Sequence, residues 1–63
     1  MLSSRKIIAA LTANGWVQVG QRGSHLQFRH PRKLGRVTVP HPKKDVAVGT
    51  IRSIEQQSGV KLT

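Results

Sequence analysis

The sequence predicts an α+β fold in which two helices cover one face of a small three-stranded antiparallel sheet, in the order α-β-β-β-α. Apolar residues recur at helical spacing near both ends of the chain and alternate at strand spacing in three short middle segments. Turns containing glycine or proline separate those segments. Two amphipathic helices on one sheet face form a two-layer sandwich. A chain of 63 residues is expected to form a single domain, residues 1–63.

The first helix is predicted to run from a serine cap to about Ala13. Either Ser3 or Ser4 can provide the cap, because a serine hydroxyl accepts a hydrogen bond from an early helical amide that has no other partner. The apolar side chains between these limits recur at helical spacing and form one stripe. Asn14-Gly15 then ends the helix, since glycine adopts the left-handed conformation that closes a last turn.

Three strands are predicted over residues 16–20, 25–30 and 36–40. Their connections, residues 20–23 and 31–35, contain glycine, proline and basic residues, which is typical of hairpin turns. Successive side chains of a strand point to opposite faces, so the apolar members face the helices and the polar members face away. The predicted inward residues are Leu26, Phe28, Val37 and Val39.

The second helix is predicted to begin at a threonine cap, Thr50, and to end at Gly59. A basic loop, residues 41–45, connects the third strand to this part of the chain. Trp16 directly follows the first helix. We interpret it as a packing anchor of the core rather than as a base-stacking residue, because the chain has little other aromatic side chain to bury.

The charge balance indicates a polyanionic partner. Eleven lysines and arginines oppose only two acidic residues, which gives a formal net charge of +9. Soluble surfaces ordinarily mix both signs, so this excess favours RNA, DNA or an acidic protein surface over a basic surface without a partner. No apolar run approaches the ~20 residues of a membrane span, and cysteine is absent. The sequence therefore predicts a cytoplasmic protein that binds no membrane.

The stretch Gly23-Ser24-His25 is the candidate catalytic feature. It places a histidine at the start of the second predicted strand, on the polar sheet face, and imidazole titrates near neutral pH, where it can transfer protons. On a ribonucleotide, His25 would handle the proton of a 2′-hydroxyl attack while cations offset the charge on phosphorus. The residues alone leave a second interpretation open, in which His25 contacts phosphate without chemistry. The predicted substrate-binding residues are Gly23, Ser24, Arg22, Arg29, His41 and Lys43.

The other two histidines are interpreted differently. His30 shares the inward parity of the second strand and is predicted to pack at its end. His41, in the basic loop, is better placed for contact with phosphate. Neither a metal site nor a cofactor is predicted, because the histidine spacings match no helical pair or zinc module and only two carboxylates occur.

Four motifs stand out along the chain: Asn14-Gly15-Trp16 after a short helix, Gly23-Ser24-His25-x-x-Phe28, Val37-x-Val39-Pro40-His41-Pro42 and Gly49-Thr50-x-Arg52-x-Ile54. Together they resemble the HicA toxin family. The resemblance covers nearly the whole chain and implies a fold like that of double-stranded-RNA-binding domains. It also implies an mRNA interferase whose catalytic histidine is His25, neutralised by a cognate HicB antitoxin that covers the active site.

The predicted function is therefore a ribosome-independent endoribonuclease, the toxin of a toxin–antitoxin pair, which cleaves mRNA with one histidine. Ordinary double-stranded-RNA-binding domains bear a lysine cluster at the start of the last helix, whereas residues 51–55 contain no lysine. Single-stranded or locally unpaired RNA is therefore the expected substrate. A non-catalytic RNA-binding module is the alternative from another functional class, and a degenerate toxin kept as an antitoxin-binding partner is a third possibility.

Overall fold

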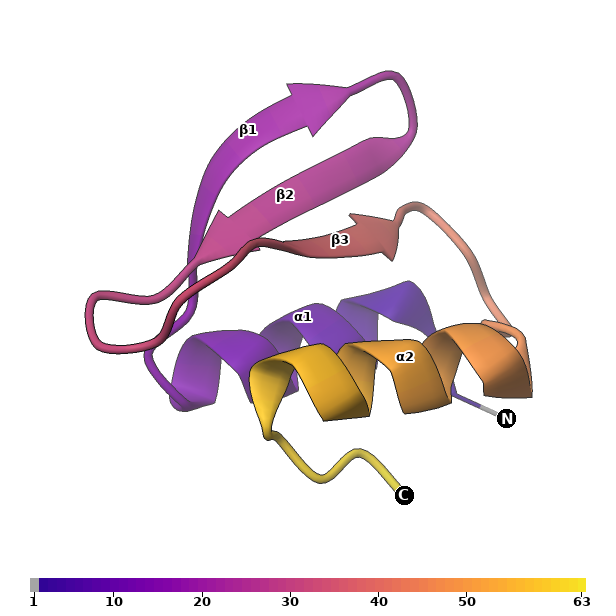
Figure 1. The fold of residues 1–63 in the computed structure, drawn as a ribbon. Coiled ribbons are helices and arrows are strands. Elements are labelled where there is room, and N and C mark those ends of the chain that lie inside the picture. Colours follow the sequence, from indigo (N-terminus) through magenta and orange to yellow (C-terminus); the bar gives the residue numbers. More distant parts are fainter. Residues whose placement is uncertain (1) are drawn as a thin grey trace.

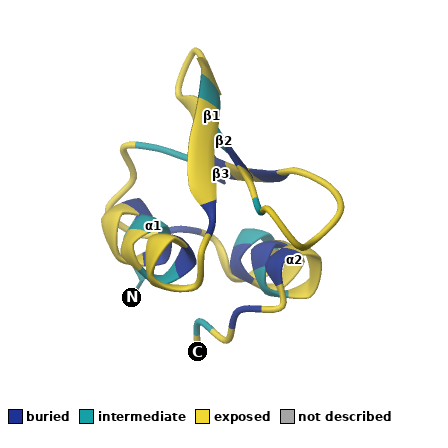
Figure 2. Ribbon diagram, turned by 90° about the vertical axis from the view of Figure 1, so that its left-hand side faces the viewer, coloured by how far each residue is buried: buried dark blue, intermediate teal, exposed yellow. Residues whose placement is uncertain are grey.

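The computed structural model describes residues 2–63 and has the predicted order of elements (Figure 1). These are α1 (Ser4–Ala13), β1 (Val17–Arg22), β2 (His25–Arg29), β3 (Val37–Pro40) and α2 (Val48–Ser58). The strands form one antiparallel sheet in the order β1-β2-β3. The two helices lie side by side under one face of this sheet, with β3 nearest to them (Figures 1 and 2). The predicted α+β two-layer sandwich is therefore confirmed.

Helix α1 begins as the serine-cap pattern predicts. The hydroxyl of Ser3 accepts a hydrogen bond from the backbone N–H of Lys6 at 3.2 Å, so Ser3 is the cap. Ser4 is the first helical residue, and its hydroxyl contacts the loop after β3 instead. After Asn14, Gly15 turns the chain with a φ of 90°, a conformation that glycine adopts without steric cost.

The hairpin between β1 and β2 is tighter than predicted. Strand β1 continues to Arg22, which pairs with His25, so the connection is the two-residue turn Gly23-Ser24 and not residues 20–23. Gly23 has a φ of 59° and Ser24 has a negative φ. A positive φ at the first central residue alone is the pattern of a type II′ turn, whose twist matches that of the flanking strands. The prediction of the longer connection is wrong for this reason.

Strand β1 extends beyond the cover of the helices. Its register against β2 shifts at Val19, where β1 carries one extra residue, and such a bulge bends a strand and increases its twist. Figure 1 shows β1 as the strand farthest from both helices, and Val17 and Val19 are 58% and 52% exposed. The other bounds lie close to prediction, since β2 ends at Arg29 and β3 begins at Val37.

Helix α2 begins before the predicted threonine cap. Its first residue is Val48, the cap position is Ala47, and no side chain caps it, so the prediction of Thr50 as the cap is wrong. The physical reason is a tertiary anchor in the preceding segment. Val46 is buried, and its backbone N–H donates to the carbonyl oxygen of Leu2 at 2.8 Å. Packing thus decides where the chain enters the helix and overrides the local capping preference.

The end of α2 follows the prediction. Gly59 has a φ of 72°, and its N–H donates to the carbonyl oxygen of Glu55 at 2.8 Å, as in a left-handed helix cap. The ammonium group of Lys33, from the connection between β2 and β3, donates to the carbonyl oxygen of Ser58 at 2.9 Å. A cation at the carbonyl end of a helix is also favoured by the helix dipole.

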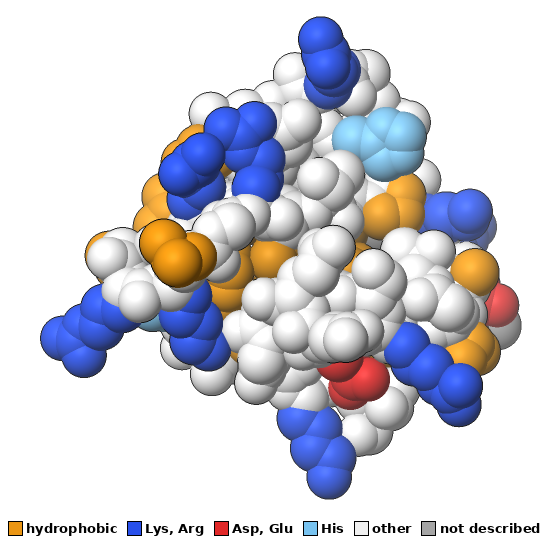
Figure 3. Space-filling view, in the orientation of Figure 1, with side chains coloured by type: hydrophobic (Ala, Val, Ile, Leu, Met, Phe, Trp, Pro, Cys, Tyr) orange, Lys and Arg blue, Asp and Glu red, His pale blue; other side chains and the backbone are white. Residues whose placement is uncertain are grey.

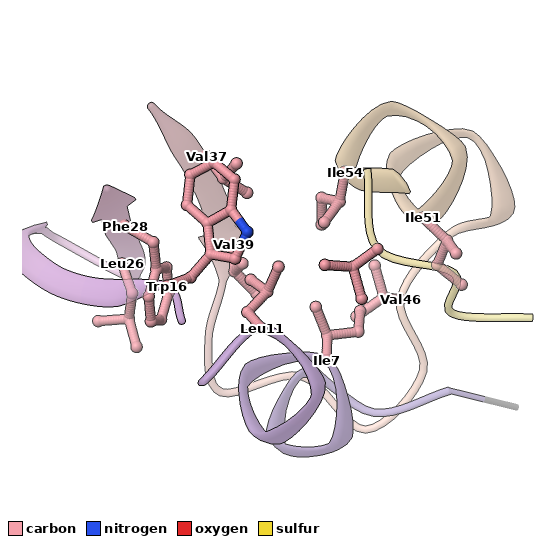
Figure 4. Packing of buried hydrophobic residues seen from close by; sticks show 11 residues of the cluster. Ile7, Leu11, Trp16, Leu26, Phe28, Val37, Val39, Val46, Ile51 and Ile54 are labelled. Atoms are coloured by element: carbon pink, nitrogen blue, oxygen red, sulfur yellow. The ribbon is translucent and has the colours of Figure 1, made fainter. Parts of the chain in front are cut away.

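The core lies between the inner sheet face and the two helices (Figure 4). Trp16 is 1% exposed, which confirms its interpretation as a packing anchor. The predicted inward residues of β2 and β3 are buried as well. Because this cluster occupies the inner face of the sheet, the opposite face is left for contact with a ligand. The buried apolar residues are Ile7, Leu11, Trp16, Leu26, Phe28, Val37, Val39, Val46, Ile51, Ile54 and Val60.

Candidate active site

The outer face of the sheet, which the helices do not cover, carries His25. Burial alternates along β2 and leaves His25, Gln27 and Arg29 on the outer face. Directly paired residues of neighbouring strands share a face, with Cβ atoms about 5 Å apart. His25 pairs with Arg22 of β1 on one side and with Pro40 of β3 on the other. The register therefore places Arg22 directly beside His25 on the outer face, and its role in substrate binding stays a prediction.

Two hydrogen bonds hold the turn that precedes His25. The side-chain N–H of Gln21 donates to the carbonyl oxygen of Gly23 at 3.0 Å, and the backbone N–H of His41 donates to that of Ser24 at 2.7 Å. A Cβ atom at Gly23 would meet no atom within 4 Å, so glycine is needed there for its positive φ and not for space. Gly23 and Ser24 thus form the turn itself, and their contact with substrate stays a prediction.

The imidazole of His25 is exposed, and neither of its nitrogens has a hydrogen-bond partner among residues 2–63. No carboxylate of this part of the chain orients the ring. Glu55 instead accepts hydrogen bonds from the backbone N–H groups of Leu62 at 2.7 Å and Thr63 at 3.1 Å. The hydrogen bond from Leu62, and to a smaller extent that from Thr63, holds the pKa of the Glu55 carboxyl below its ordinary value of 4.5. The ring of His25 is therefore open to a ligand, and Glu55 is committed to the C-terminal segment.

His41 follows β3 and lies next to the turn that carries His25. Its Nδ1 lies 2.7 Å from the hydroxyl oxygen of Ser4, the first residue of α1. Ser4 is 1% exposed, and its hydroxyl oxygen also accepts a hydrogen bond from the backbone N–H of Lys43 at 2.9 Å. The peptide bond between His41 and Pro42 is cis. The predicted site residue His41 is thus placed by contacts to α1 that no local sequence pattern indicates.

His30 packs at the end of β2, as predicted. Its ring meets the ring of Trp16 edge-on, with the ring centroids 5.3 Å apart. Nδ1 accepts a hydrogen bond from the backbone N–H of Arg32 at 3.0 Å, and Nε2 lies 2.9 Å from the carbonyl oxygen of Asn14. Because Nδ1 is an acceptor, Nε2 carries the proton and donates it to that carbonyl. Both ring nitrogens are used inside the fold, so His30 takes no part in the candidate site.

The basic residues of the predicted site fall into two places. Arg22 and Arg29 are exposed on the same sheet face as His25, whereas Lys43 lies in the loop after β3. The predicted site does not include Arg36, yet the guanidinium of Arg36 donates to the side-chain oxygen of Gln27 at 2.8 Å on the outer face. The outward parity of Arg36 in its strand pattern was the signal that could have included it.

The space-filling view shows how widely the cations are spread. Lys and Arg side chains stand out around the whole outline of the molecule in Figure 3, whereas acidic side chains occupy little of that face. A surface hollow of about 440 Å³ lies beyond the end of β3, between residues 3–5 of the α1 end and residues 41–44 of the loop. Because the positive charge is spread over the surface, it attracts a polyanion to every side of the molecule, and local geometry must decide where the polyanion binds.

Two further observations concern metal ions and membranes. Within residues 2–63, no three histidine, cysteine, aspartate or glutamate side chains come together as metal ligands would. Neither of the two helices in this part of the chain is long and apolar enough to cross a lipid bilayer.

Comparison with known proteins identifies the family. The profile of the family described as "HicA toxin of bacterial toxin-antitoxin" matches residues 4–60, a span that contains every predicted site residue. Among solved structures, one described as "HicA3 and HicB3 toxin-antitoxin complex" is similar with a TM-score of 0.85 and 29% sequence identity, over 98% of this chain and 100% of that chain. The comparison with curated proteins found no match. The chain therefore belongs to the HicA toxin family.

Proposed function

We propose that the protein is the toxin of a type II toxin–antitoxin pair and acts as a ribosome-independent endoribonuclease that cleaves mRNA. The observation that carries this proposal is the exposed imidazole of His25 on a sheet face that also bears Arg22 and Arg29. Such a surface attracts a phosphate strand and presents a proton-transfer group to it. Membership of the HicA toxin family supports the same conclusion.

In the proposed reaction, His25 accepts the proton of a 2′-hydroxyl as its oxygen attacks the neighbouring phosphorus. The bond from phosphorus to the 5′-oxygen breaks and that oxygen takes up a proton, so the products are a 2′,3′-cyclic phosphate end and a 5′-hydroxyl end. Arg22 and Arg29 offset the charge that develops on the phosphoryl oxygens. The remaining proposed substrate contacts are Gly23, Ser24, His41 and Lys43.

The proposed substrate is single-stranded or locally unpaired RNA. Proteins that bind duplex RNA read its shape through contacts along its grooves and backbone. Helix α2 presents few side chains that could make such contacts. Ile51 and Ile54 are buried in the core, and Arg52 is the only basic residue of that helix. Unpaired nucleotides, in contrast, can approach the outer sheet face one at a time.

Expression of the wild type and of His25→Ala from a tightly repressed promoter tests the proposal. The wild type is expected to arrest growth, and His25→Ala is expected to lose at least about 100-fold in cleavage rate, because a general base contributes on that order. Cut sites mapped in total RNA should carry 2′,3′-cyclic phosphate ends. The position is exposed, so the variant should keep its fold by circular dichroism. Full toxicity of His25→Ala would overturn the assignment.

A non-catalytic RNA-binding module is the second candidate function. One observation favours it: among residues 2–63 nothing orients the His25 ring or shares its proton, and catalytic imidazoles are commonly held by a second group. Purified protein incubated with labelled RNA in the presence of EDTA separates the two candidates. Retarded but uncut RNA favours the module, whereas cleavage that disappears in His25→Ala favours the enzyme.

We also propose a HicB-type antitoxin as the protein partner. The similar solved structure is described as a complex of HicA3 with HicB3, and a net charge of +9 suits a partner with an acidic surface. Such a partner would cover the outer sheet face and keep RNA away from His25. Co-expressed antitoxin should therefore copurify with both the wild type and His25→Ala and should block cleavage. Undiminished cleavage by the saturated complex would contradict this mode of neutralisation.

A further inference from the structure

The hollow beside the α1 end is close in the fold to the candidate active site. His25 pairs with Pro40. The backbone N–H of the next residue, His41, donates a hydrogen bond to the carbonyl oxygen of Ser24 at 2.7 Å. His41 also lines the hollow, whose volume is about 440 Å³. Paired residues of antiparallel strands have Cα atoms about 5 Å apart, and His41 lies one residue beyond the pair. The hollow therefore lies next to the end of the sheet at which β2 begins with His25.

A buried serine fixes one side of the His41 ring. The hydroxyl oxygen of Ser4 lies 2.7 Å from Nδ1 of His41, accepts from the backbone N–H of Lys43 at 2.9 Å, and lies 3.2 Å from the carbonyl oxygen of Lys43. This hydroxyl joins the start of α1 to the loop after β3, where His41 and Lys43 lie 37 and 39 positions further along the chain. Nε2 of His41 has no hydrogen-bond partner among residues 2–63. The arrangement thus holds the ring through one nitrogen and leaves the other for a ligand.

The positive charge of the hollow comes from side chains. Arg5, Lys43 and Lys44 line it and are exposed, whereas neither of the two acidic residues does. The end of α1 adds little, because the backbone N–H of Ser4 donates to the carbonyl oxygen of Lys43 at 2.8 Å and that of Lys6 donates to the Ser3 hydroxyl at 3.2 Å. A cluster of three cations with an oriented imidazole and no acid is suited to an anion.

We propose that this hollow is a phosphate subsite of the RNA strand, distinct from the position of the phosphate at His25. Nε2 of His41 donates a hydrogen bond to an oxygen of the bound phosphate, and Arg5, Lys43 and Lys44 supply its countercharge. Ser4 is a positioning residue that acts through His41. Because the ligand is taken to be RNA, the proposal rests on the function proposed above. The subsite marks the place where the RNA strand leaves the outer face of the sheet.

A thermodynamic cycle between protein and ligand tests the subsite. The protein is the full chain with His25→Ala, and the probe is a 2′-O-methyl RNA oligonucleotide, which has no free 2′-hydroxyl and stays uncut. In a set of probes, one phosphate at a time is replaced by an uncharged methylphosphonate. Affinities are measured by fluorescence anisotropy, with and without the added substitutions Lys43→Gln and Lys44→Gln. Both lysines are exposed, so these variants are expected to fold.

The expected result is that the lysine substitutions and the methylphosphonate replacement have coupled effects on binding at one phosphate of the probe. Neutralising that phosphate should weaken binding by roughly tenfold, in line with a hydrogen bond to a charged group, and this effect should shrink once both lysines are replaced. The slope of log K against log salt should fall by about 0.7 for each phosphate of the single strand that the protein no longer neutralises. The control is Lys6→Gln, which removes one positive charge, against two in the double variant, from a residue in the first turn of α1 that does not line the hollow.

Three outcomes would overturn the proposal. The first is equal coupling for Lys6→Gln, which would mean that only general charge matters. The second is a uniform effect of all methylphosphonate positions, which would mean that no phosphate has a fixed place. The third is unchanged RNA affinity together with weaker binding of the antitoxin, which would make the hollow a docking place for acidic side chains of the partner.

The failure of the subsite and the failure of the proposed function remain distinguishable. Binding is measured with a variant and a probe that do not react, so coupling at one phosphate supports the subsite even if the wild type cuts no RNA. Cleavage by the wild type without coupling at any phosphate supports the enzyme and overturns the subsite.

Discussion

At the scale of single residues, the three histidines differ in what their ring nitrogens contact. His30 uses both nitrogens on backbone groups, and His41 uses one on the hydroxyl of Ser4. His25 uses neither among residues 2–63. A fully bonded imidazole has no donor or acceptor left for a ligand, whereas the others keep one or two. This is the physical ground for assigning His30 to the scaffold and for keeping the other two as candidate site residues.

Substitution of the buried serine should reveal its positioning role. Ser4→Ala leaves the backbone N–H of Lys43 without its acceptor and Nδ1 of His41 without a partner. The free energy of unfolding, measured by urea denaturation, should fall by about 1–3 kcal/mol. Ring resonances of His41 in NMR spectra should shift, while those of His30 stay in place. The control Ser53→Ala, at an exposed position of α2, should change neither quantity. Unaltered His41 resonances in Ser4→Ala would contradict the role.

At the scale of elements, the structure joins the helices to the sheet through turns with little freedom. Gly15 follows α1 with a φ of 90°, and a Cβ atom there would lie 2.8 Å from Nε2 of His30. That nitrogen in turn donates to the carbonyl oxygen of Asn14 at 2.9 Å. One small residue therefore lets the end of α1, the start of the sheet and the end of β2 pack together around Trp16.

Gly15→Ala should destabilise the fold for two reasons, the left-handed backbone and the clash with His30. A non-glycine residue in that conformation costs about 1–3 kcal/mol, and displacement of the His30 ring adds to it. The control is Gly49→Ala in α2, where φ is not positive and a Cβ atom would meet nothing within 4 Å. Its stability should be unchanged or slightly raised. Denaturant midpoints compare the two variants, and equal midpoints would refute the argument for Gly15.

The prediction of elements from the sequence succeeded where a pattern is local. Periodicity gave the faces of β2 and β3, and Gly59 ends α2 as predicted. It failed at Thr50, because the buried Val46 starts the helix earlier. The predicted length of the hairpin connection is also wrong. Residues 20–23 have glycine at both ends, so a turn can form around either one, and only the pairing of the strands selects the turn at Gly23.

At the scale of the whole molecule, the C-terminal segment closes the core over α2. Val60 is 6% exposed and belongs to the core, and Leu62 packs against it. The carboxylate of Glu55 holds this segment through the backbone N–H groups of Leu62 and Thr63. For a chain of this size, which buries a smaller share of its surface than larger domains, closing that side of the core matters to stability.

The same contact predicts how stability depends on pH. The pKa of Glu55 is lowered in the folded protein from its ordinary value of 4.5, first by the Leu62 amide and then by that of Thr63. A lowered folded pKa means that the carboxylate stabilises the fold fully above about pH 4.5 and that this contribution is lost as the pH falls through the folded value. The wild type should therefore be more stable than Glu55→Gln near neutral pH, with the difference vanishing in acid. Thermal unfolding across a pH series measures it, and a difference that is constant with pH would disprove the linkage.

The α-β-β-β-α order, the buried faces and the exposure of His25 on a basic surface follow from local patterns in the sequence, because periodicity, turn residues and charge are properties of neighbouring positions. Three other features depend on long-range packing: the contact of Ser4 with His41, the hollow that both residues line, and the hold of Glu55 on the C-terminal segment. Ser4 and His41 stand 37 positions apart, and no local pattern reports a contact across that distance. It arises because α1 and β3 pack on each other and bring a buried hydroxyl to the edge of the candidate site.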